Sequence, residues 1–233
     1  MRLNEFLGLL DGDGCLKKRV SFANCNPKIV HDVCLKFKRF SNKEVKAYIN
    51  TYWPKDVISD EGLIRYWKKY LPDKIKFYKI RRCIRTTRNL RKRETPKLHG
   101  TVELKIHNIK LTNKLLELLK TTKKQCLFNK HTAIGFLKGI IAAEGSVKLV
   151  DNKLRELRIS SADLMEQNFL RNTLKNIGIE PSKAKYKFYI AISGLRNFKP
   201  IHKYKLFSLH PEKNEKFVQG FQNLIVNWPL RGE

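Results

Sequence analysis

Acidic residues are scarce in this 233-residue sequence, which has 49 Lys and Arg against 21 Asp and Glu and a formal net charge of +28. A chain with so much positive charge repels itself, and a polyanion relieves that repulsion, so nucleic acid is the first partner to consider. An anionic membrane surface is the second. The basic residues are interleaved with strand-like patterns and do not form one amphipathic face, which argues against the membrane surface.

Paired cysteines and long apolar runs are also lacking. The five cysteines are scattered and form no CxxC pair, which argues against a disulfide framework and a structural zinc site. The six histidines form no HExxH or other metal-spaced pair, so histidine-based metal chemistry is not indicated. No apolar stretch is long enough to span a bilayer, and acids interrupt the short apolar run near the start, unlike a signal peptide. We therefore expect an intracellular, non-secreted protein with no membrane partner.

An internal repeat is present, together with a hydrophobic content of 42% that is enough for a packed core. FLGLLDGDG at 6–14 recurs as LKGIIAAEG at 137–145, with small, apolar and acidic residues in register. A repeat at this distance predicts two related halves. We place these halves at 1–125 and 126–233, with 121–135 as the linker between them.

The sequence after each copy also repeats in kind. CLKKRVSFAN (15–24) and SVKLVDNKLRELRISS (146–161) each predict a hairpin, and a helix with a polar cap follows each, at Asn26 and at Asp163. The strands predicted later are TVELKIH (101–107) and KFYIAIS (187–193). The sequence therefore predicts an α+β fold with two αββαββα-type halves related by a pseudo-twofold axis.

The first half is longer than the second because of a basic insertion near 52–98. Within it, KIKFYKIRRCIR alternates well enough to predict a strand. The insertion could extend a contact surface for nucleic acid or brace the first half, and the sequence leaves both roles open.

Small residues four positions apart line both copies of the repeated phrase. They are Gly8 and Gly12 in the first copy, and Gly139 and Ala143 in the second. Residues at this spacing share one side of a helix. Two smooth sides that face each other let helix backbones approach closely, as small residues do in pairs of membrane helices. We therefore expect the two motif helices to pack side by side.

An acid closes each motif, Asp13 in the first copy and Glu144 in the second. A carboxylate at a helix C-terminus faces the negative end of the helix dipole, which costs about 0.3–1 kcal/mol, and neighbouring acids repel each other. Mg²⁺ offsets both effects, since it takes one or two carboxylates and completes its shell with water and phosphate oxygens. Such acids in a basic protein predict metal-assisted phosphodiester hydrolysis. Asp11, whose counterpart is Ala142, is expected to be a solvated or capping residue.

These features resemble the LAGLIDADG homing endonucleases in their single-chain, two-motif form, with FLGLLDGDG and LKGIIAAEG matching the family's nine-residue motif. The resemblance implies motif helices at the interface between the halves and antiparallel sheets that form a DNA-binding saddle. It implies a monomeric hydrolase that makes double-strand cuts with staggered ends at a long asymmetric DNA site, and that is intron-encoded, carried in an intein or free-standing. Mg²⁺ is the expected cofactor and Mn²⁺ an alternative, while Ca²⁺ is expected to bind without supporting cleavage. The metal-binding residues carried over are Asp13 and Glu144, with Gly12 and Ala143 beside them.

The resemblance also implies further site residues. Family members often carry a polar residue, frequently glutamine, at the end of the second strand, where Asn24 and Ser161 stand here. Lys17 and Lys148 match each other in register and are candidates for a basic residue near the metal; strand lysines that touch phosphates are the alternative. Lys and Arg would supply phosphate contacts and base readout. The candidates for DNA contact are Lys76, Arg81, Arg85, Arg155, Arg158, Lys185 and Lys187.

Two other functions remain as alternatives. An RNA-binding splicing maturase would keep the basic saddle, bind intron RNA and not need the acids. A DNA-binding regulator on the same fold would be expected to have lost one or both acids. Asp13 and Glu144 are both present, which favours the nuclease.

Overall fold

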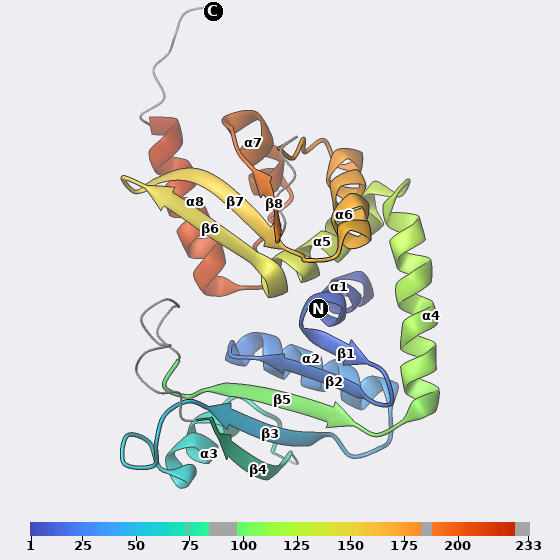
Figure 1. The fold of residues 1–233 in the computed structure, drawn as a ribbon, viewed down its shortest axis with the longest axis vertical. Helices are drawn as coiled ribbons and strands as arrows, with labels where there is room; N and C mark the ends of the chain where they lie inside the picture. Colours follow the sequence, from blue (N-terminus) through green and yellow to red (C-terminus); the bar gives the residue numbers. More distant parts are fainter. Residues whose placement is uncertain (74, 84–96, 183–187, 227–233) are drawn as a thin grey trace, which may run out of the picture. The chain divides into compact units, whose positions relative to one another are not determined.

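We analysed a computed structural model of the chain, which describes residues 1–73, 75–83, 97–182 and 188–226 (Figure 1). Its contacts divide into two compact units: unit 1 comprises Met1–Gly12 with Glu117–Glu233, and unit 2 comprises Asp13–Leu116. The contact units therefore differ from the halves read from the repeat, because the first motif helix is grouped with unit 1. The boundary between the repeated halves stays a prediction.

Unit 2 is built on a five-stranded sheet with the strand order β1-β2-β5-β3-β4. The strands are β1 (Gly14–Leu16), β2 (Val20–Asn24), β3 (Lys46–Thr51), β4 (Lys76–Arg82) and β5 (Thr101–Ile106). The predicted hairpin is confirmed as the antiparallel pair β1–β2. The predicted antiparallel pairing is confirmed for β1–β2, β2–β5 and β3–β5, while β3 and β4 at one edge run parallel. A parallel pair needs a crossover connection, and the insertion supplies it through α3 (Asp60–Lys68).

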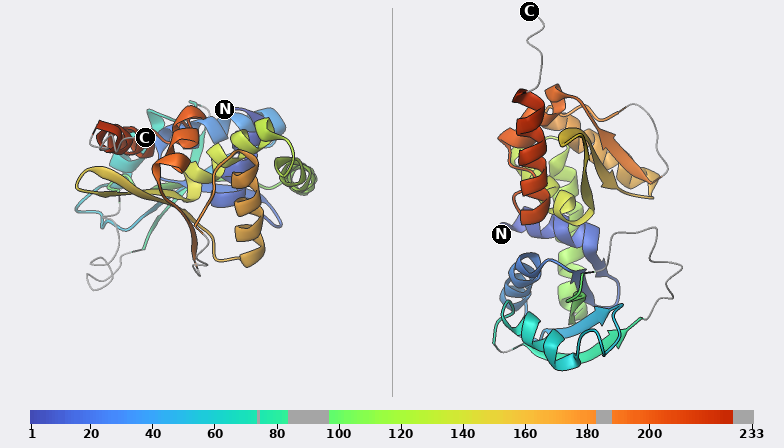
Figure 2. Two further views of the ribbon diagram at one scale, coloured as in Figure 1. Left: turned by 90° about the horizontal axis from the view of Figure 1, so that it is seen from above. Right: turned by 90° about the vertical axis from the view of Figure 1, so that its left-hand side faces the viewer.

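Helices cover one face of this sheet. The predicted cap of α2 (Pro27–Phe40) is confirmed, because the Asn26 side chain accepts from the backbone N–H groups of Lys28 and Ile29. Buried side chains of α2, among them Val33 and Phe37, lie in the core of unit 2, and α2 packs on β2 and β5. α2 and α3 lie on the same side of the sheet (Figure 2).

Unit 1 contains a three-stranded antiparallel sheet with the strand order β6-β7-β8. The strands are β6 (Gly145–Val150), β7 (Lys153–Ser160) and β8 (Tyr189–Ile192). The predicted turn between β6 and β7 is confirmed: Asp151 and Asn152 have φ of 50° and 57°, the positive values that a two-residue hairpin turn of this kind requires. The helices that follow the hairpin are α6 (Leu164–Asn176), α7 (Leu195–Lys203) and α8 (Pro211–Val226). The side chain of Asp163 caps α6 as predicted.

The second motif helix, α5 (Lys130–Glu144), lies in the core of unit 1. It packs on α6, β6 and β7, and it buries Phe136, Leu137 and Ile141 among other residues. A helix that is apolar on most sides is typical of a buried position. Even so, no helix within the described ranges is both long enough and apolar enough to cross a membrane.

The connection before α5 is shorter than the sequence predicted. α4 (Ile109–Cys126) continues through the first part of the expected linker at 121–135, and α5 begins at Lys130. The segment 121–126 contains neither glycine nor proline, so nothing in it ends the helix. Asn129 then caps α5, since its side chain accepts from the backbone N–H of Thr132. The non-helical connection is therefore 127–129.

The first motif helix, α1 (Leu3–Asp13), packs on α5 with its backbone in close approach. A Cβ atom placed on Gly8 would lie 2.1 Å from the carbonyl oxygen of Phe136. One placed on Gly139 would lie 2.2 Å from the carbonyl oxygen of Glu5. These contacts lie inside unit 1, and they confirm the predicted packing of the small residues.

We expect Gly139→Ala to lower the free energy of unfolding by about 1–3 kcal/mol, because the new methyl group overlaps backbone atoms that cannot move aside. Urea unfolding followed by circular dichroism measures the change. Gly62→Ala in α3 is the matched control: its Cβ would lie 3.3 Å from the hydroxyl oxygen of Ser59, and alanine favours a helix interior. Equal stability of Gly139→Ala and the parent protein would refute the close approach.

Candidate functional site

Each motif helix ends in an acid, as the repeat predicts. α1 ends at Asp13 and α5 ends at Glu144, and neither helix has a basic residue in its last turn. The negative end of the helix dipole is therefore not offset by the helix's own side chains. Residues from other elements must stabilise the two carboxylates.

Asp13 is held by Asn24 within unit 2. The side-chain amide of Asn24 donates to Oδ2 of Asp13 at 2.6 Å. Oδ1 of Asn24 accepts from the backbone N–H of Asn26, the cap of α2, at 2.7 Å. Asn24 is the last residue of β2, so the end of this strand and the start of α2 together set the orientation of the Asp13 carboxylate.

Glu144 lines a small pocket of about 140 Å³ within unit 1. The other residues that line it are Asp11, Gly12, Ile140, Ser160, Ser161, Glu166 and Leu170. Ser161 therefore lines the same pocket as Glu144, and its hydroxyl donates to the backbone carbonyl of Asp163 at 3.3 Å. The pocket brings three carboxylates together in a strongly basic protein.

The expectation that Asp11 is a solvated or capping residue is wrong. Its side chain is only 12% exposed and forms an ion pair with Lys123 of α4 at 2.8 Å. Burial raises the pKa of Asp11 to about 6, because the loss of water outweighs the attraction of Lys123. The side chain points into unit 1, a direction that the motif alone does not reveal.

Lys123 bridges two of the three carboxylates. Its ammonium lies 2.8 Å from Asp11 and 2.7 Å from Glu166. The pKa of Lys123 is raised although burial opposes its charge, because both carboxylates favour the protonated form. No sequence pattern marks Lys123 for this role, since it is one of several lysines in its helix.

Lys213 of α8 offsets the dipole at the end of α5. Its ammonium donates to the carbonyl oxygens of Ala142 and Ala143, at 2.7 and 3.2 Å. Lys213 is not predicted by any sequence pattern, because it is 70 positions from Ala143 along the chain. The contact shows that the C-terminus of α5 accommodates a cation.

The donors near the end of α5 suit a hard divalent ion. Glu144 supplies carboxylate oxygen to the pocket, whereas the carbonyl of Ala143 accepts from the ammonium of Lys213. Mg²⁺ prefers oxygen ligands and needs only one or two carboxylates from the protein. No group of three or more His, Cys, Asp or Glu side chains within the described ranges could hold a metal ion. The residues therefore fit an ion that keeps several waters, and not one in an all-protein cage.

The two candidate lysines are exposed. Lys17 follows β1 in the turn of the first hairpin, and Lys148 lies on β6. Neither takes part in an ion pair among the residues that the structure describes. Their role near a metal stays a prediction.

The candidates for DNA contact are strand residues where they are described. Lys76 is exposed on β4, and Arg155 is exposed on β7. Arg81 forms an ion pair with Glu103 at 3.2 Å. Arg158 pairs with Glu156 and lies over the ring of Tyr189 at 4.5 Å. Arg85, Lys185 and Lys187 lie outside the described residues.

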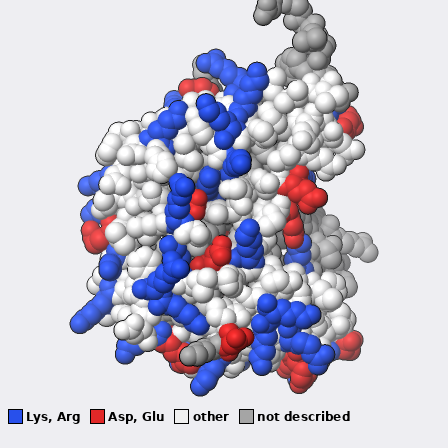
Figure 3. Space-filling model, turned by 180° about the vertical axis from the view of Figure 1, so that it is seen from behind, with Lys and Arg blue, Asp and Glu red and all other residues white. Residues whose placement is uncertain are grey.

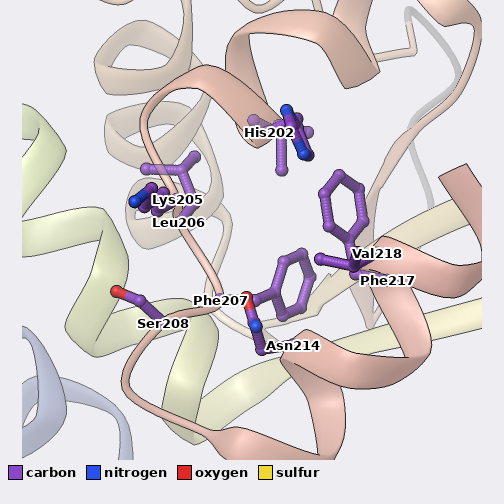
Figure 4. A pocket seen from close by; sticks show the side chains of 9 residues that line it. His202, Lys205, Leu206, Phe207, Ser208, Asn214, Phe217 and Val218 are labelled. Atoms are coloured by element: carbon purple, nitrogen blue, oxygen red, sulfur yellow. The ribbon is translucent and has the colours of Figure 1, made fainter. Parts of the chain in front are cut away.

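A second hollow in unit 1, of about 230 Å³, has a different character (Figure 4). Aromatic side chains form much of its wall, with Phe207 and Phe217 stacked at 5.1 Å between ring centroids. No carboxylate lines it. It therefore lacks the ligands that phosphodiester hydrolysis with Mg²⁺ requires.

Comparison with known proteins bears on the fold. No family model and no curated protein sequence matches the chain. Full-length DUF199/WhiA from Thermatoga maritima is 10% identical, with a TM-score of 0.54, over 99% of this chain and 61% of that chain. The N-terminal LAGLIDADG domain of DUF199/WhiA is 13% identical, with a TM-score of 0.49, over 88% of this chain and 80% of that chain. I-DmoI in complex with DNA and Mn is 18% identical, with a TM-score of 0.48, over 85% of this chain and 93% of that chain.

These likenesses concern the fold. The predicted α+β class is confirmed by the helices and sheets of the chain, and full-length DUF199/WhiA shares this fold over 99% of this chain. I-DmoI is a homing endonuclease, and its structures include complexes with DNA and Mn, Ca or Mg. At identities of 10–18%, the activity of this chain has to be argued from its own residues.

We expect Lys123→Met to lower the free energy of unfolding by about 1–3 kcal/mol at pH 7.5, because two partly buried carboxylates lose their counter-ion. The loss should be smaller at pH 5, where Asp11 is protonated. A carboxyl with a raised folded-state pKa binds its proton more tightly when folded, so parent stability should also decline as the pH rises through about 6. Urea unfolding at both pH values measures these changes.

Lys124→Met is the control for this variant, because Lys124 is the exposed neighbour of Lys123 in α4. It should change stability by less than about 0.5 kcal/mol, as is usual for surface substitutions. If Lys123→Met and Lys124→Met change the free energy of unfolding equally at both pH values, the ion pairs of Lys123 with Asp11 and Glu166 contribute nothing to stability.

Proposed function

We propose that this chain is a site-specific endonuclease that makes metal-dependent double-strand cuts with staggered ends at a long asymmetric DNA site. One observation carries the proposal: both motif helices end in a carboxylate, at the helix terminus where a carboxylate is least stable. A bound cation turns this unfavourable position into a favourable one. A protein that only binds DNA gains nothing from keeping two such acids.

Asp13 and Glu144 are the proposed metal ligands, one acid for each DNA strand. When bound, Mg²⁺ supplies a Lewis acid at the scissile phosphate and lowers the pKa of a bound water. Asn24 fixes the carboxylate of Asp13 through a hydrogen bond of 2.6 Å. Lys213 holds the last carbonyls of α5 and so fixes the backbone that carries Glu144. Gly12 lets the two motif helices approach closely beside Glu144, since a Cβ atom on Gly12 would lie 2.5 Å from the Cβ of Ala143 and 3.2 Å from the Cγ of Glu144.

The charge of the protein supports duplex DNA as the substrate. Lys and Arg side chains are spread over the face shown in Figure 3, with acids in smaller groups. Phosphate contacts by these side chains would supply most of the affinity and make it strongly dependent on salt. A single chain with both motifs needs no second copy to provide two acids, so we propose that it acts as a monomer in the cell.

A maturase or a DNA-binding regulator would use the same basic surface, the first to bind intron RNA and the second to bind DNA without cutting it. Neither requires an acid at the end of a motif helix. The hydrogen bond from Asn24 to Asp13 favours the nuclease, because it orients a carboxylate that RNA or DNA binding alone would not use.

We expect Asp13→Asn and Glu144→Gln each to slow double-strand cleavage by at least about 1,000-fold, since loss of metal stabilisation costs several kcal/mol of barrier. DNA binding should be kept. The assay incubates a randomised duplex library with the protein and Mg²⁺ or Mn²⁺, and sequencing of the new ends shows the cleavage site and its stagger. Band shifts on the recovered site measure binding.

Glu117→Gln is the matched control, because Glu117 is an exposed acid on α4. It should cut at the parent rate. Normal double-strand cutting by either motif variant would show that the acids are not the site. Tight binding to one structured RNA with no DNA cleavage would transfer the assignment to the maturase.

A further inference from the structure

The insertion near 52–98 adds the strand β4 to the sheet of unit 2, and this strand pairs in parallel with β3. β4 is the outermost strand of the five-stranded sheet. All other strand pairs in the described part of the chain are antiparallel. β4 therefore extends the sheet beyond the strands that the repeated pattern accounts for.

One side of β4 fastens the insertion to unit 2. The side chain of Arg82 is 12% exposed and forms an ion pair with Asp60 at the start of α3. Its guanidinium also donates to the carbonyl oxygens of Trp53 and Ile58, at 2.7 and 3.0 Å. Arg82 thus ties the strand, the preceding loop and the helix together, which is a bracing role.

The other side of β4 continues the polar face of the sheet. In the strand register, Lys79 is opposite Tyr48, and Arg81 is opposite Asn50. Tyr48 is in turn opposite Glu103 of β5. Paired residues of neighbouring strands share a face of the sheet. Lys79 and Arg81 therefore lie on the same face as Tyr48 and Glu103, on the outermost strand.

Arg81 is held in a defined position on this face. Its guanidinium lies over the ring of Tyr48 at 4.8 Å and bonds to Glu103 at 3.2 Å. Lys105 also lies over Tyr48, at 4.6 Å, and pairs with Glu103 at 2.8 Å. The side chain of Arg81 is still 40% exposed. An arginine held by a ring and a carboxylate loses less conformational freedom when it binds a phosphate or a guanine edge.

The charge of β4 fits a polyanion. The strand, KFYKIRR, contains Lys76, Lys79, Arg81 and Arg82 and no acid. Lys76 and Lys79 are exposed. A duplex carries regularly spaced phosphates, and an exposed basic edge strand is complementary to them.

We propose that β4 is an outer DNA-binding strand whose Lys79 and Arg81 lengthen the stretch of duplex bound by unit 2, while Arg82 on the opposite side braces the insertion. This inference rests on the proposed function only in that the partner is duplex DNA. The two roles that the sequence left open for the insertion are thus divided between the two sides of one strand.

The test uses a duplex of random sequence as the probe, so it does not depend on cleavage. In the full chain without Mg²⁺, lysine acetylation followed by mass spectrometry should show Lys79 protected by DNA and Lys68 and Lys69 not protected. Lys79→Gln/Arg81→Gln should reduce the slope of log affinity against log salt by up to about 2, since each phosphate contact contributes about 0.9.

Lys68→Gln/Lys69→Gln is the matched control, because these exposed residues belong to the same insertion but lie at the end of α3. This control should keep the parent slope. Equal labelling of Lys79 with and without DNA, equal slopes for the two double variants, or protection by structured RNA alone would each overturn the inference. Protection of Lys79 in a protein that never cuts DNA would support it while the proposed endonuclease fails.

Discussion

The approach of α1 to α5 at Gly8 and Gly139 is the constraint on which unit 1 depends. With a Cβ position only 2.1 Å from a carbonyl oxygen, no residue larger than glycine fits at Gly8 without a shift of backbone. The same approach brings Gly12 against Ala143 and the side chain of Glu144. A single helix contact therefore sets the packing of α1 on α5 and places Gly12 in the pocket that Glu144 lines.

Several acids of this basic chain are placed against particular groups. Lys123 bridges Asp11 and Glu166, and Asn24 holds Asp13. Glu103 gathers Arg81 and Lys105 on the sheet of unit 2. A carboxylate that pairs with a Lys or Arg side chain also fixes the position of that side chain. These acids therefore orient the basic groups around them as well as lower the net charge. This organisation is consistent with a protein that must present basic groups in fixed positions to a polyanion.

The helices and strands that the sequence predicts correctly are indicated by patterns that extend over only a few residues. The caps at Asn26 and Asp163, the turn at Asp151 and Asn152, and the alternation that becomes β4 all depend on local backbone geometry and local burial. The motif acids were found for a different reason. The repeat shows which positions of the two motif copies correspond. An acid that ends both copies is a stronger indication of a functional site than an acid that ends only one copy.

The sequence by itself therefore determined the α+β class, both motif helices, their hairpins and the acids at their ends, because each is written in local spacing or in the repeat. Only the tertiary structure decided the rest. Asp11 forms an ion pair with Lys123, and β4 pairs in parallel with β3. Lys213 donates to the carbonyl of Ala143 at the end of α5, although the two residues are 70 positions apart. These features depend on which distant segments meet when the chain packs, and neither the spacing of residues nor their type encodes that meeting.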